Sequence, residues 1–587
     1  MLQVIRNAVL YAINYFNSEL HISQNEILVE RPKDVTLGDI CTNAAMVFAK
    51  KCGTTPRELA DRICYELIHN QNVLDASIAG YGFVNIKICN DYWRSLVNRI
   101  ILEKNNFSIA KNIGNNNKLN IEFVSANPTG PLHTGHARNA VFGSVAANLL
   151  EKIGYKVTRE FYINDQGNQI KCLARSVYLR YIELLGNKIY EEQFSSDMYC
   201  GEYVKEIAKE VLDKYGNIFL NKSESEWLSI FCEFSINCML SNIKSDLKDL
   251  GVVMDVYTSE AELCKKGLVN EALEILKQHE DIYEGVLPKP KGTSKEDWEE
   301  RPQTLFKSTK YGDDIDRAIK KSDGTWTYFA GDLAYHLDKI RRGFNKMLLV
   351  LGADHNGYVK RMKAAVSALS NSKANIEIRL YQLVNFLENG KPVRMSKRKG
   401  QFITLKAVVN RVGKDVTRYM MISRHHDVII DFDFVKAVEF SMDNPLFYIQ
   451  YAHARICSVF EYYKRIFKIE DVSIRELLEV DKSALRDEAE INLIKQLLMW
   501  PEQVKSAALA IEPHRITVHL RDIASLFHSL WSKGKAEEQL RFINRNDKGT
   551  TLAKLSLLRA TQIVLADGLN ILGITPLSEM IRDEDNE

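Results

Sequence analysis

The sequence predicts an α/β protein built around a parallel sheet, with helical insertions in that sheet, a small α/β domain before it and an all-α bundle after it. A strand, a helix and a second strand follow one another between residues 119 and 163. Two further short apolar runs, at 346–351 and 376–384, suit buried strands. From about Pro445 onward we find only helix patterns.

The first 110 residues form the first predicted domain. Helix patterns cover residues 2–20 and 56–69, and residues 83–88 have a short strand pattern. The polar, Asn-rich stretch 104–118 that follows is typical of a linker. We therefore expect a small α/β domain that ends near residue 110.

The second predicted domain spans residues 111–375. Strand 119–124, helix 137–152 and strand 156–163 form a βαβ unit, which requires parallel strands and indicates a Rossmann-like sheet. A helix pattern at 359–369 separates the two later strands. Residues 170–255 are mostly helical by pattern, so we expect them to be inserted into the sheet.

The last two predicted regions are residues 376–444, which contain a basic loop, and residues 445–587. The second of these carries four long helix patterns, at 445–466, 488–511, 515–532 and 552–572. Gly573 and Pro576 supply a stop signal for the last helix. This region predicts a helical bundle.

Composition limits the classes of function. The 587 residues carry a net charge of +2 with a pI of about 7.9, which is weak evidence against a nucleic-acid binder, because such domains often exceed pI ~9. None of the 10 cysteines forms a C-x-x-C pair, so we expect no zinc site and a reducing compartment. No run of 18 apolar residues occurs, so we expect no membrane partner and a cytoplasmic location.

The most informative segment is residues 121–136, IEFVSANPTGPLHTGH. A predicted strand leads into a Gly/Pro-rich turn and then into a helix N-terminus that carries His133 and His136. The unpaired N–H groups of a helix N-terminus suit phosphate, and Gly135 lets a nucleotide approach the backbone. Both histidines could instead be ordinary polar loop residues. Their position between a strand and a helix favours phosphate binding.

A second candidate site is the loop 391–400, KPVRMSKRKG, in which five of ten residues are basic. A basic loop is often only a solvated surface. A loop of this composition after an apolar strand can also close over a triphosphate.

These two segments resemble the signatures of class I aminoacyl-tRNA synthetases. His133-Thr-Gly-His136 is similar to their HIGH motif, and Met395-Ser-Lys-Arg398 to their KMSKS loop, in the same order. The resemblance implies that His133, His136 and Lys397 are catalytic. The first lysine of the loop pattern is Arg394 here, and the last serine is Arg398; the charge survives at Arg394, but its guanidinium is bulkier and forked.

Within that class the chain resembles the arginyl-tRNA synthetases of the bacterial type. The resemblance rests on FVSANPTGP from Phe123, YINDQGNQ from Tyr162, SDGT from Ser322, YFAGD from Tyr328, GADH from Gly352 and YAHAR from Tyr451. It extends over nearly the whole chain. It implies ATP-dependent activation of L-arginine to arginyl-adenylate and transfer to the terminal ribose of tRNA(Arg), with Mg²⁺ on ATP, no protein metal site and no tightly bound cofactor.

The resemblance also implies binding residues. Arginine would contact Glu122, Asn127, Tyr328, Asp332, His355 and Glu260. ATP would contact Ala126, Asn127, Pro128, Thr129, Gly130, Pro131, Leu132, Thr134, Gly135, Met395 and Ser396. A guanidinium needs paired carboxylate contacts, which agrees with this set. Taken alone, Asp332 could be a helix-start carboxylate and Tyr328 a half-buried core tyrosine.

For tRNA we expect contacts from Tyr448, Tyr451, His453 and Arg455, which offer stacking surfaces and a cation. The alternative is that most of these side chains belong to the core of the bundle. The family habit implies a monomer without a DNA partner. Rival functions are a synthetase for glutamate or cysteine, a small nucleotidyltransferase with the same H-x-G-H turn, and an inactive RNA-binding paralogue.

Overall fold

The computed structural model describes residues 2–580 except 31, 33, 191–193, 289–300 and 394–402. Met395, Ser396 and Lys397 of the basic loop therefore lie outside the described residues. The chain divides into two compact units. The smaller contains Met1–Phe107, Arg455–Met499 and Ser525–Val564, and the larger contains Ser108–Ala454, Trp500–Ala524 and Leu565–Glu587.

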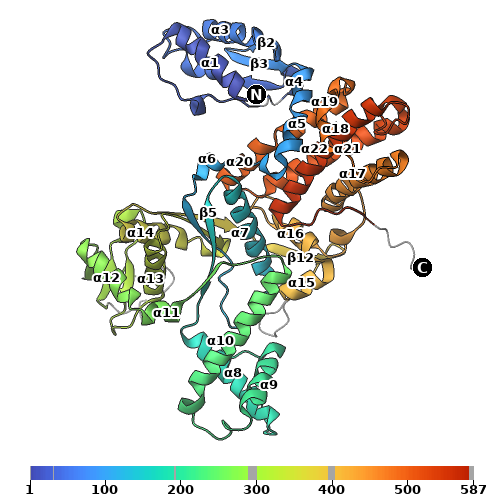
Figure 1. The fold of residues 1–587 in the computed structure, drawn as a ribbon. Coiled ribbons are helices and arrows are strands. Elements are labelled where there is room, and N and C mark those ends of the chain that lie inside the picture. Colours follow the sequence, from blue (N-terminus) through green and yellow to red (C-terminus); the bar gives the residue numbers. More distant parts are fainter. Residues whose placement is uncertain are drawn as a thin grey trace. The chain divides into compact units, whose positions relative to one another are not determined.

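A five-stranded parallel sheet forms the centre of the larger unit, with strand order β11-β10-β4-β5-β6 (Figure 1). Its strands are β4 (Lys118–Glu122), β5 (Lys156–Ile163), β6 (Val256–Ser259), β10 (Lys346–Gly352) and β11 (Asn375–Tyr381). The predicted α/β class with a Rossmann-like parallel sheet is confirmed. The sequence did not predict β6, whose four half-buried residues give no apolar signal.

The predicted strand at 376–384 was too long. It ends at Tyr381, and Val384 begins a strand of a separate three-stranded sheet. That sheet contains β12 (Val384–Glu388), β13 (Lys391–Pro392) and β14 (Ile430–Asp433). Helices α15 (Leu405–Val412) and α16 (Lys414–Ile422) lie between β13 and β14 in the sequence. The apolar run continues across the break, so periodicity alone could not place it.

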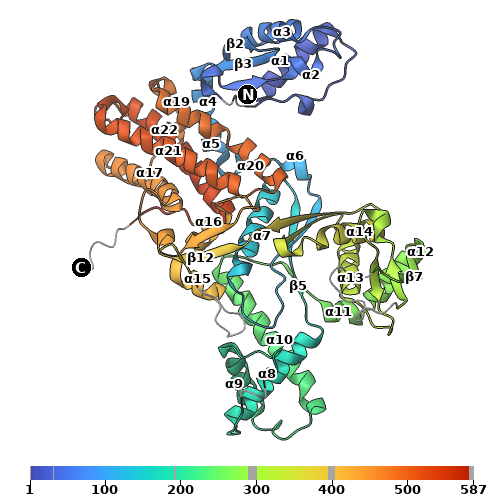
Figure 2. The same cartoon turned by 180° about the vertical axis from the view of Figure 1, so that it is seen from behind.

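Two groups of helices are inserted between the strands of the parallel sheet. The first is α8 (Asn168–Leu184), α9 (Glu202–Tyr215) and α10 (Glu224–Asp249), which share an aromatic core in which Tyr178 stacks on Trp227 at 3.9 Å. The second contains α11 (Glu260–Lys265), α12 (Leu268–Gln278), α13 (Tyr328–Arg341) and α14 (Tyr358–Ser370), together with the antiparallel strands β7 (Ile282–Gly285), β8 (Gln303–Phe306) and β9 (Arg317–Lys320). Figure 2 shows the two groups as separate bodies on either side of β5.

The stretch 104–118 is not the free linker that its polarity predicted. It contains α6 (Lys111–Gly114), and the Gly114 N–H donates to the Ile153 carbonyl at 2.8 Å. A Cβ on Gly114 would lie 2.3 Å from the Gly154 carbonyl carbon, so only glycine allows this approach. Residues 110–116 therefore pack on the end of α7 (Thr134–Lys152).

The C-terminal region is helical, as predicted, with one correction. Its helices are α17 (Pro445–Phe467), α18 (Ile474–Glu479), α19 (Glu488–Leu498), α20 (Trp500–Ala510), α21 (His514–Ala536) and α22 (Lys548–Leu572). The single helix expected at 488–511 is two helices that meet at Met499. Pro501 has no N–H and fits only the first turn of a helix, so a new helix begins at Trp500.

The smaller unit contains a three-stranded antiparallel sheet with strand order β1-β3-β2. Its strands are β1 (Ile40–Thr42), β2 (Val73–Ala79) and β3 (Phe83–Ile88), and its N-terminal helices are α1 (Leu2–Phe16), α2 (Ala44–Phe48), α3 (Pro56–Ile68), α4 (Asn90–Ser95) and α5 (Val97–Glu103). Thr55 and Glu58 form a capping box that begins α3.

Helix α22 is the one described helix that is long and apolar enough to cross a membrane, with a mean hydropathy of 1.3. However, 72% of that apolar window is buried inside the protein. Core helices of soluble proteins have the same character, so the helix is weak evidence for a membrane span.

Candidate active site

The two histidines form the N-terminal cap of α7. The Gly135 N–H donates to His133 Nδ1 at 3.0 Å, and the His133 N–H donates to His136 Nδ1 at 3.2 Å. The two rings lie 3.9 Å apart. Because both Nδ1 atoms accept backbone hydrogen bonds, each neutral ring carries its proton on Nε2. Gly135 makes this possible, since a Cβ there would lie 2.8 Å from the His133 ring.

The sharp turn before these histidines has an unusual backbone. Val124 and Ser125, which follow the end of β4 after Phe123, have φ values of 69° and 40°. Positive φ is rare for a β-branched residue and must be held by its surroundings. Here the Val124 N–H donates to Asn139 Oδ1 at 2.9 Å, and Ser125 Oγ accepts from the Tyr162 N–H at 3.1 Å. The turn is thus fixed by α7 and β5.

A cavity adjoins the histidines. Its lining combines residues of the predicted segment, namely Asn127, Thr129, Gly130, Pro131, His133 and His136, with residues 196–201 and Tyr203 of the first helical insertion. The Tyr203 hydroxyl donates to the Thr129 carbonyl at 2.9 Å. This second wall could not be predicted from the sequence, because its residues form neither an apolar pattern nor a motif.

The other predicted ATP-contacting residues are not in the described lining of that cavity. Ala126, Pro128, Leu132 and Thr134 are buried, so their side chains support the turn. The Gly135 N–H is already bonded to His133. Contacts from these five residues stay predictions.

The basic loop is anchored beside the histidines on its C-terminal side. The Thr134 N–H donates to the Ile403 carbonyl at 3.2 Å, and the Leu405 N–H donates to the Leu132 carbonyl at 2.7 Å. Lys397 is six residues before Ile403.

Three of the predicted carboxylates surround Tyr162. The Tyr162 hydroxyl bonds to Glu260, and negative charge on Glu260, Asp332 and Glu122 raises the tyrosine pKa beyond what burial alone does. Gly331 allows Glu260 to lie close, since a Cβ there would be 2.8 Å from Glu260 Oε1. The chain thus concentrates negative charge at the ends of β4 and β5, where α11 and α13 begin.

One cation that the sequence did not single out belongs to this cluster. Lys339 Nζ donates to Glu122 Oε2 at 2.6 Å, with 1% and 8% of the two side chains exposed. The ammonium also lies 4.0 Å from the centre of the Tyr335 ring, which stacks on Tyr162. Lys339 and Asp332 are seven residues apart on α13 and hence share a helix face. In the sequence, this seven-residue spacing from Asp332 was the only feature that could have indicated a role for Lys339.

Asp332 is a carboxylate of this cluster whose acidity is strongly altered. The residue is partly exposed, yet burial of its carboxyl group raises the pKa to about 7, and Glu122 adds to this rise. Arg361 acts in the opposite direction. Burial likewise raises the pKa of Glu260, followed by the effect of Asp165.

The remaining predicted arginine contacts are more exposed. Tyr328 begins α13 and is 84% exposed, so the alternative of a half-buried core tyrosine is wrong. Asn127 Nδ2 donates to Gln169 Oε1 at 3.0 Å. His355 lies in a short turn after β10, where its Nε2 is 3.7 Å from Asp354 Oδ2.

The residues proposed for tRNA all lie on α17 but differ in exposure. Tyr448 and Tyr451 are partly exposed, and Phe447 stacks on Tyr451 at 5.5 Å. The expected tRNA contact from His453 is corrected by its burial. Its side chain is 6% exposed and its Nδ1 lies 2.7 Å from the Leu577 carbonyl oxygen, so it packs in the core. The Arg455 guanidinium lies 4.9 Å from the Trp531 ring.

Among the residues that the structure describes, no three His, Cys, Asp or Glu side chains are arranged to hold a metal ion.

Three family models match consecutive parts of the chain. The arginyl tRNA synthetase N-terminal domain matches residues 3–88, the catalytic domain of tRNA synthetases class I (R) matches 96–442, and the DALR anticodon binding domain matches 449–580. The catalytic model alone covers more than half of the sequence.

Similar proteins extend over nearly the full length. The chain is 49% identical over 558 residues to an arginine–tRNA ligase of Wolbachia pipientis wMel, covering 95% of both chains. It is 46% identical over 581 residues to one of Ruegeria pomeroyi, covering 98% of this chain and 99% of the relative. A Campylobacter jejuni structure named as an arginyl-tRNA synthetase has a TM-score of 0.71 at 31% identity, over 84% of this chain and all of that one. A Thermus thermophilus arginyl-tRNA synthetase shares the fold, with a TM-score of 0.70 at 19% identity, over 99% of this chain and all of that one.

Proposed function

The chain belongs to the arginyl-tRNA synthetases of class I, ATP-dependent ligases that join arginine to tRNA, and from this premise we propose which of its residues carry the reaction. The guanidinium of arginine binds at the carboxylate cluster, with Asp332 and Glu260 as its partners. The carboxylate cluster around Tyr162 carries this proposal. A buried concentration of negative charge is costly unless a cation completes it.

In this proposal Glu122 holds the pocket in shape and also faces the substrate. One of its oxygens accepts from Lys339 and the other from Ser125 Oγ at 3.0 Å. A carboxylate has about four acceptor positions, so a contact with the guanidinium is still compatible with both bonds. Tyr328, Asn127 and His355 complete the rim.

ATP binds in the cavity beside His133 and His136. Their Nε2–H groups are donors to phosphate oxygens, and the N-terminus of α7 adds its partial positive charge. Lys397 supplies a further cation, which the anchoring of Ile403 to Thr134 supports. ATP brings Mg²⁺ on its phosphates.

The first step is attack of the arginine carboxylate on the α-phosphate, with pyrophosphate as the leaving group. The nucleophile is already ionised, so the protein needs no general base. Its residues position the two substrates and stabilise the charge that develops on the phosphate oxygens. In the second step the 2′-hydroxyl of the terminal ribose attacks the adenylate carbonyl, and AMP leaves.

We further propose that Tyr448, Tyr451 and Arg455 contact tRNA, that the enzyme works as a cytoplasmic monomer, and that it binds neither DNA nor a membrane. The partial exposure of both tyrosines supports their role. A measurement of the molar mass in solution tests whether the enzyme is a monomer.

The test of the proposed pocket is ATP–pyrophosphate exchange with each of the twenty amino acids, with and without tRNA. Among the twenty amino acids we expect exchange only with arginine, and only when tRNA is present. Asp332→Asn should lower kcat/KM for arginine by about ten- to a hundredfold, since a charge-assisted hydrogen bond contributes ~1.5–3 kcal/mol. Asp314→Asn, which removes a carboxylate paired with Lys360 on the surface, is the matched control. Equal loss in both variants would refute the assignment of Asp332.

A further inference from the structure

A second cavity of the larger unit adjoins the one beside His133 and His136 and shares Pro131, Gly201 and Tyr203 with it. Its volume of about 380 Å³ is in the range of cavities that bind small molecules. Six of its other lining residues matter here, namely Glu202, Glu206, Asn242, Asp246, Thr404 and Lys406. They come from α9, α10 and the start of α15, and none of them has a role in the reaction proposed above.

Asp246 is a buried carboxylate that lines this cavity without a partner. The residue is 5% exposed, and no donor among the described residues bonds to its carboxylate. Burial raises its pKa to about 6, the charge of Lys406 lowers the pKa, and the charge of Asp249 raises it. An ionised carboxylate in such a place is costly, and a cation that enters the cavity would remove that cost.

Two further carboxylates make the lining strongly acidic. Glu202 and Glu206 are four residues apart on α9 and therefore share a helix face. Glu202 accepts from Lys205 Nζ at 2.9 Å on the surface, whereas Glu206 has no ion pair with any residue that the structure describes. Three carboxylates and Lys406 give the lining a net charge of −2, so a ligand with two positive charges would neutralise it.

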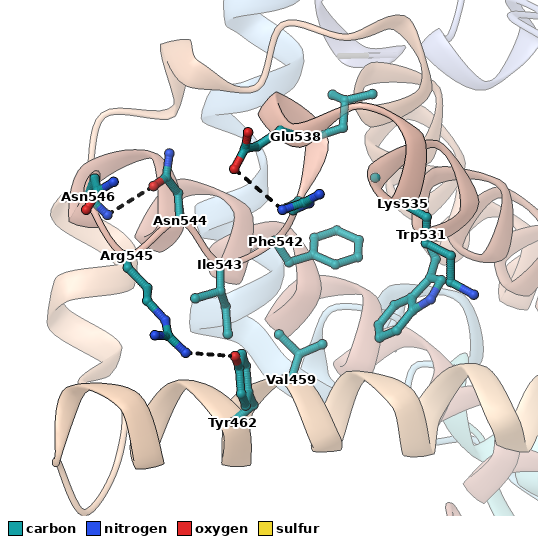
Figure 3. A pocket seen from close by; sticks show the side chains of 13 residues that line it. Val459, Tyr462, Trp531, Lys535, Glu538, Phe542, Ile543, Asn544, Arg545 and Asn546 are labelled. Atoms are coloured by element: carbon teal, nitrogen blue, oxygen red, sulfur yellow. Dashed lines mark hydrogen bonds and ion pairs between the residues drawn. The ribbon is translucent and has the colours of Figure 1, made fainter.

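This acidic lining contrasts with that of a cavity in the smaller unit, which Figure 3 shows. There Lys535, Arg541 and Arg545 accompany one carboxylate, Glu538. That basic cavity belongs to the region that matches an anticodon binding domain, so its charge agrees with a surface for RNA. The acidic cavity repels phosphate, and its ligand is therefore a cation rather than a nucleic acid.

The chemistry of the lining favours an ammonium ligand over a metal ion. In the part of the chain that the structure describes, no three His, Cys, Asp or Glu side chains could hold a metal. An ammonium group has three donors and needs several acceptors. The Asn242 amide and the Thr404 hydroxyl offer neutral acceptors beside the carboxylates. Thr404 Oγ1 accepts from the Ala407 N–H at 3.1 Å and has a second lone pair for a ligand.

We propose that this cavity binds a small linear diamine, with one ammonium group on Asp246 and the other on Glu206. The bound diamine connects the first helical insertion to the start of α15, the helix that follows the basic loop. Leu405, between Thr404 and Lys406, donates to the Leu132 carbonyl, so the ligand lies beside the histidine turn. The site takes no part in the reaction proposed above, and its failure would leave that function unchanged.

The test is calorimetric titration of the full-length enzyme with putrescine (1,4-diaminobutane), at constant ionic strength and without ATP or tRNA. We expect one saturable site. Asp246→Asn should weaken binding about tenfold or more, because it removes a charge-assisted hydrogen bond. Glu206→Gln should weaken it about fivefold, since Glu206 is exposed and its charge is partly screened.

Three controls separate a specific site from general attraction between charges. Asp213→Asn removes an exposed carboxylate of α9 outside the cavity lining and should leave putrescine binding within about twofold of wild type. Butylamine has the same carbon chain with one ammonium group and should bind about tenfold more weakly than putrescine. Mg²⁺ alone, with the same charge as putrescine, should also bind more weakly than putrescine.

Thermal unfolding at neutral pH shows whether a loss of binding comes from misfolding. A carboxyl whose pKa is raised by folding costs stability above that pKa, so Asp246→Asn without ligand should melt at or above the wild-type Tm. Putrescine should raise the Tm of wild type but not that of Asp246→Asn. The proposal would be overturned by any of three results: no saturable binding by wild type, equal binding by Asp246→Asn, or tighter binding of Mg²⁺ than of putrescine. A lower Tm of Asp246→Asn without ligand would show that Asp246 already has a partner and would also overturn it.

Discussion

The raised pKa of Asp332 predicts a pH dependence for arginine recognition that is unusual for a carboxylate. The guanidinium requires the ionised form, but burial and the neighbouring Glu122 bring the pKa of this carboxyl to about 7 in the free enzyme. For one group with that pKa, the ionised fraction is about 91% at pH 8 and about 9% at pH 6. We expect kcat/KM for arginine to fall about tenfold between these pH values.

Removing a charged neighbour of Asp332 should shift the pH at which kcat/KM falls, in a direction set by the sign of the charge removed. Glu122→Gln removes a negative charge that raises the pKa, so the fall should move to lower pH. Lys339→Met removes a positive charge that lowers the pKa, so the fall should move to higher pH. Bound arginine places a cation beside Asp332 and lowers its pKa, so kcat itself should change little over the same range.

The measurement is tRNA charging at saturating ATP and tRNA, with arginine varied, at half-unit intervals from pH 5.5 to 8.5. After each incubation the enzyme is returned to pH 8 and its charging activity is measured again, to exclude an irreversible loss of activity. A kcat/KM that is constant from pH 8 to pH 6 would show that Asp332 is not the group that meets the guanidinium. A profile that fails to move in both Glu122→Gln and Lys339→Met would contradict the electrostatic explanation.

Three other substitutions test the site. Lys397→Ala should lower kcat a hundredfold or more, because one charge-stabilising donor contributes ~3–4 kcal/mol to the transition state, and near-normal turnover would contradict the role. Lys339→Met leaves the Glu122 carboxylate buried without its cation and should destabilise the larger unit by ~3–5 kcal/mol, measured by denaturant unfolding; an unchanged stability would contradict the stabilising role of this ion pair. Gly331→Ala places a Cβ against Glu260 and should raise KM for arginine more than it lowers kcat, whereas an unchanged KM would exclude Glu260 from the pocket.

The sequence predicted the main elements well where a long periodic pattern met a chemical stop signal. Helix α7, strand β5 and the end of α22 at Leu572 follow directly from such patterns. It failed where two elements share one continuous pattern. Met499 separates two helices, and Tyr381 ends a strand, without any change in hydrophobicity that a window could detect.

The motifs alone identified His133 and His136, because a strand, a turn and a helix start are local features. They could not identify Lys339 or Tyr203, which contact Glu122 and Thr129 across 217 and 74 residues of sequence. Nor could they separate Tyr451 from His453, which are two residues apart on one helix.

What the sequence determined by itself was therefore local: the order of the elements, the cap of α7 and the residue types needed for phosphate and guanidinium. The tertiary structure decided which carboxylates lie together, which of them already has a cation, and how burial alters their acidity. These properties depend on distances between segments far apart in the chain and on exclusion of water. Neither quantity is encoded in the spacing of residues along the sequence.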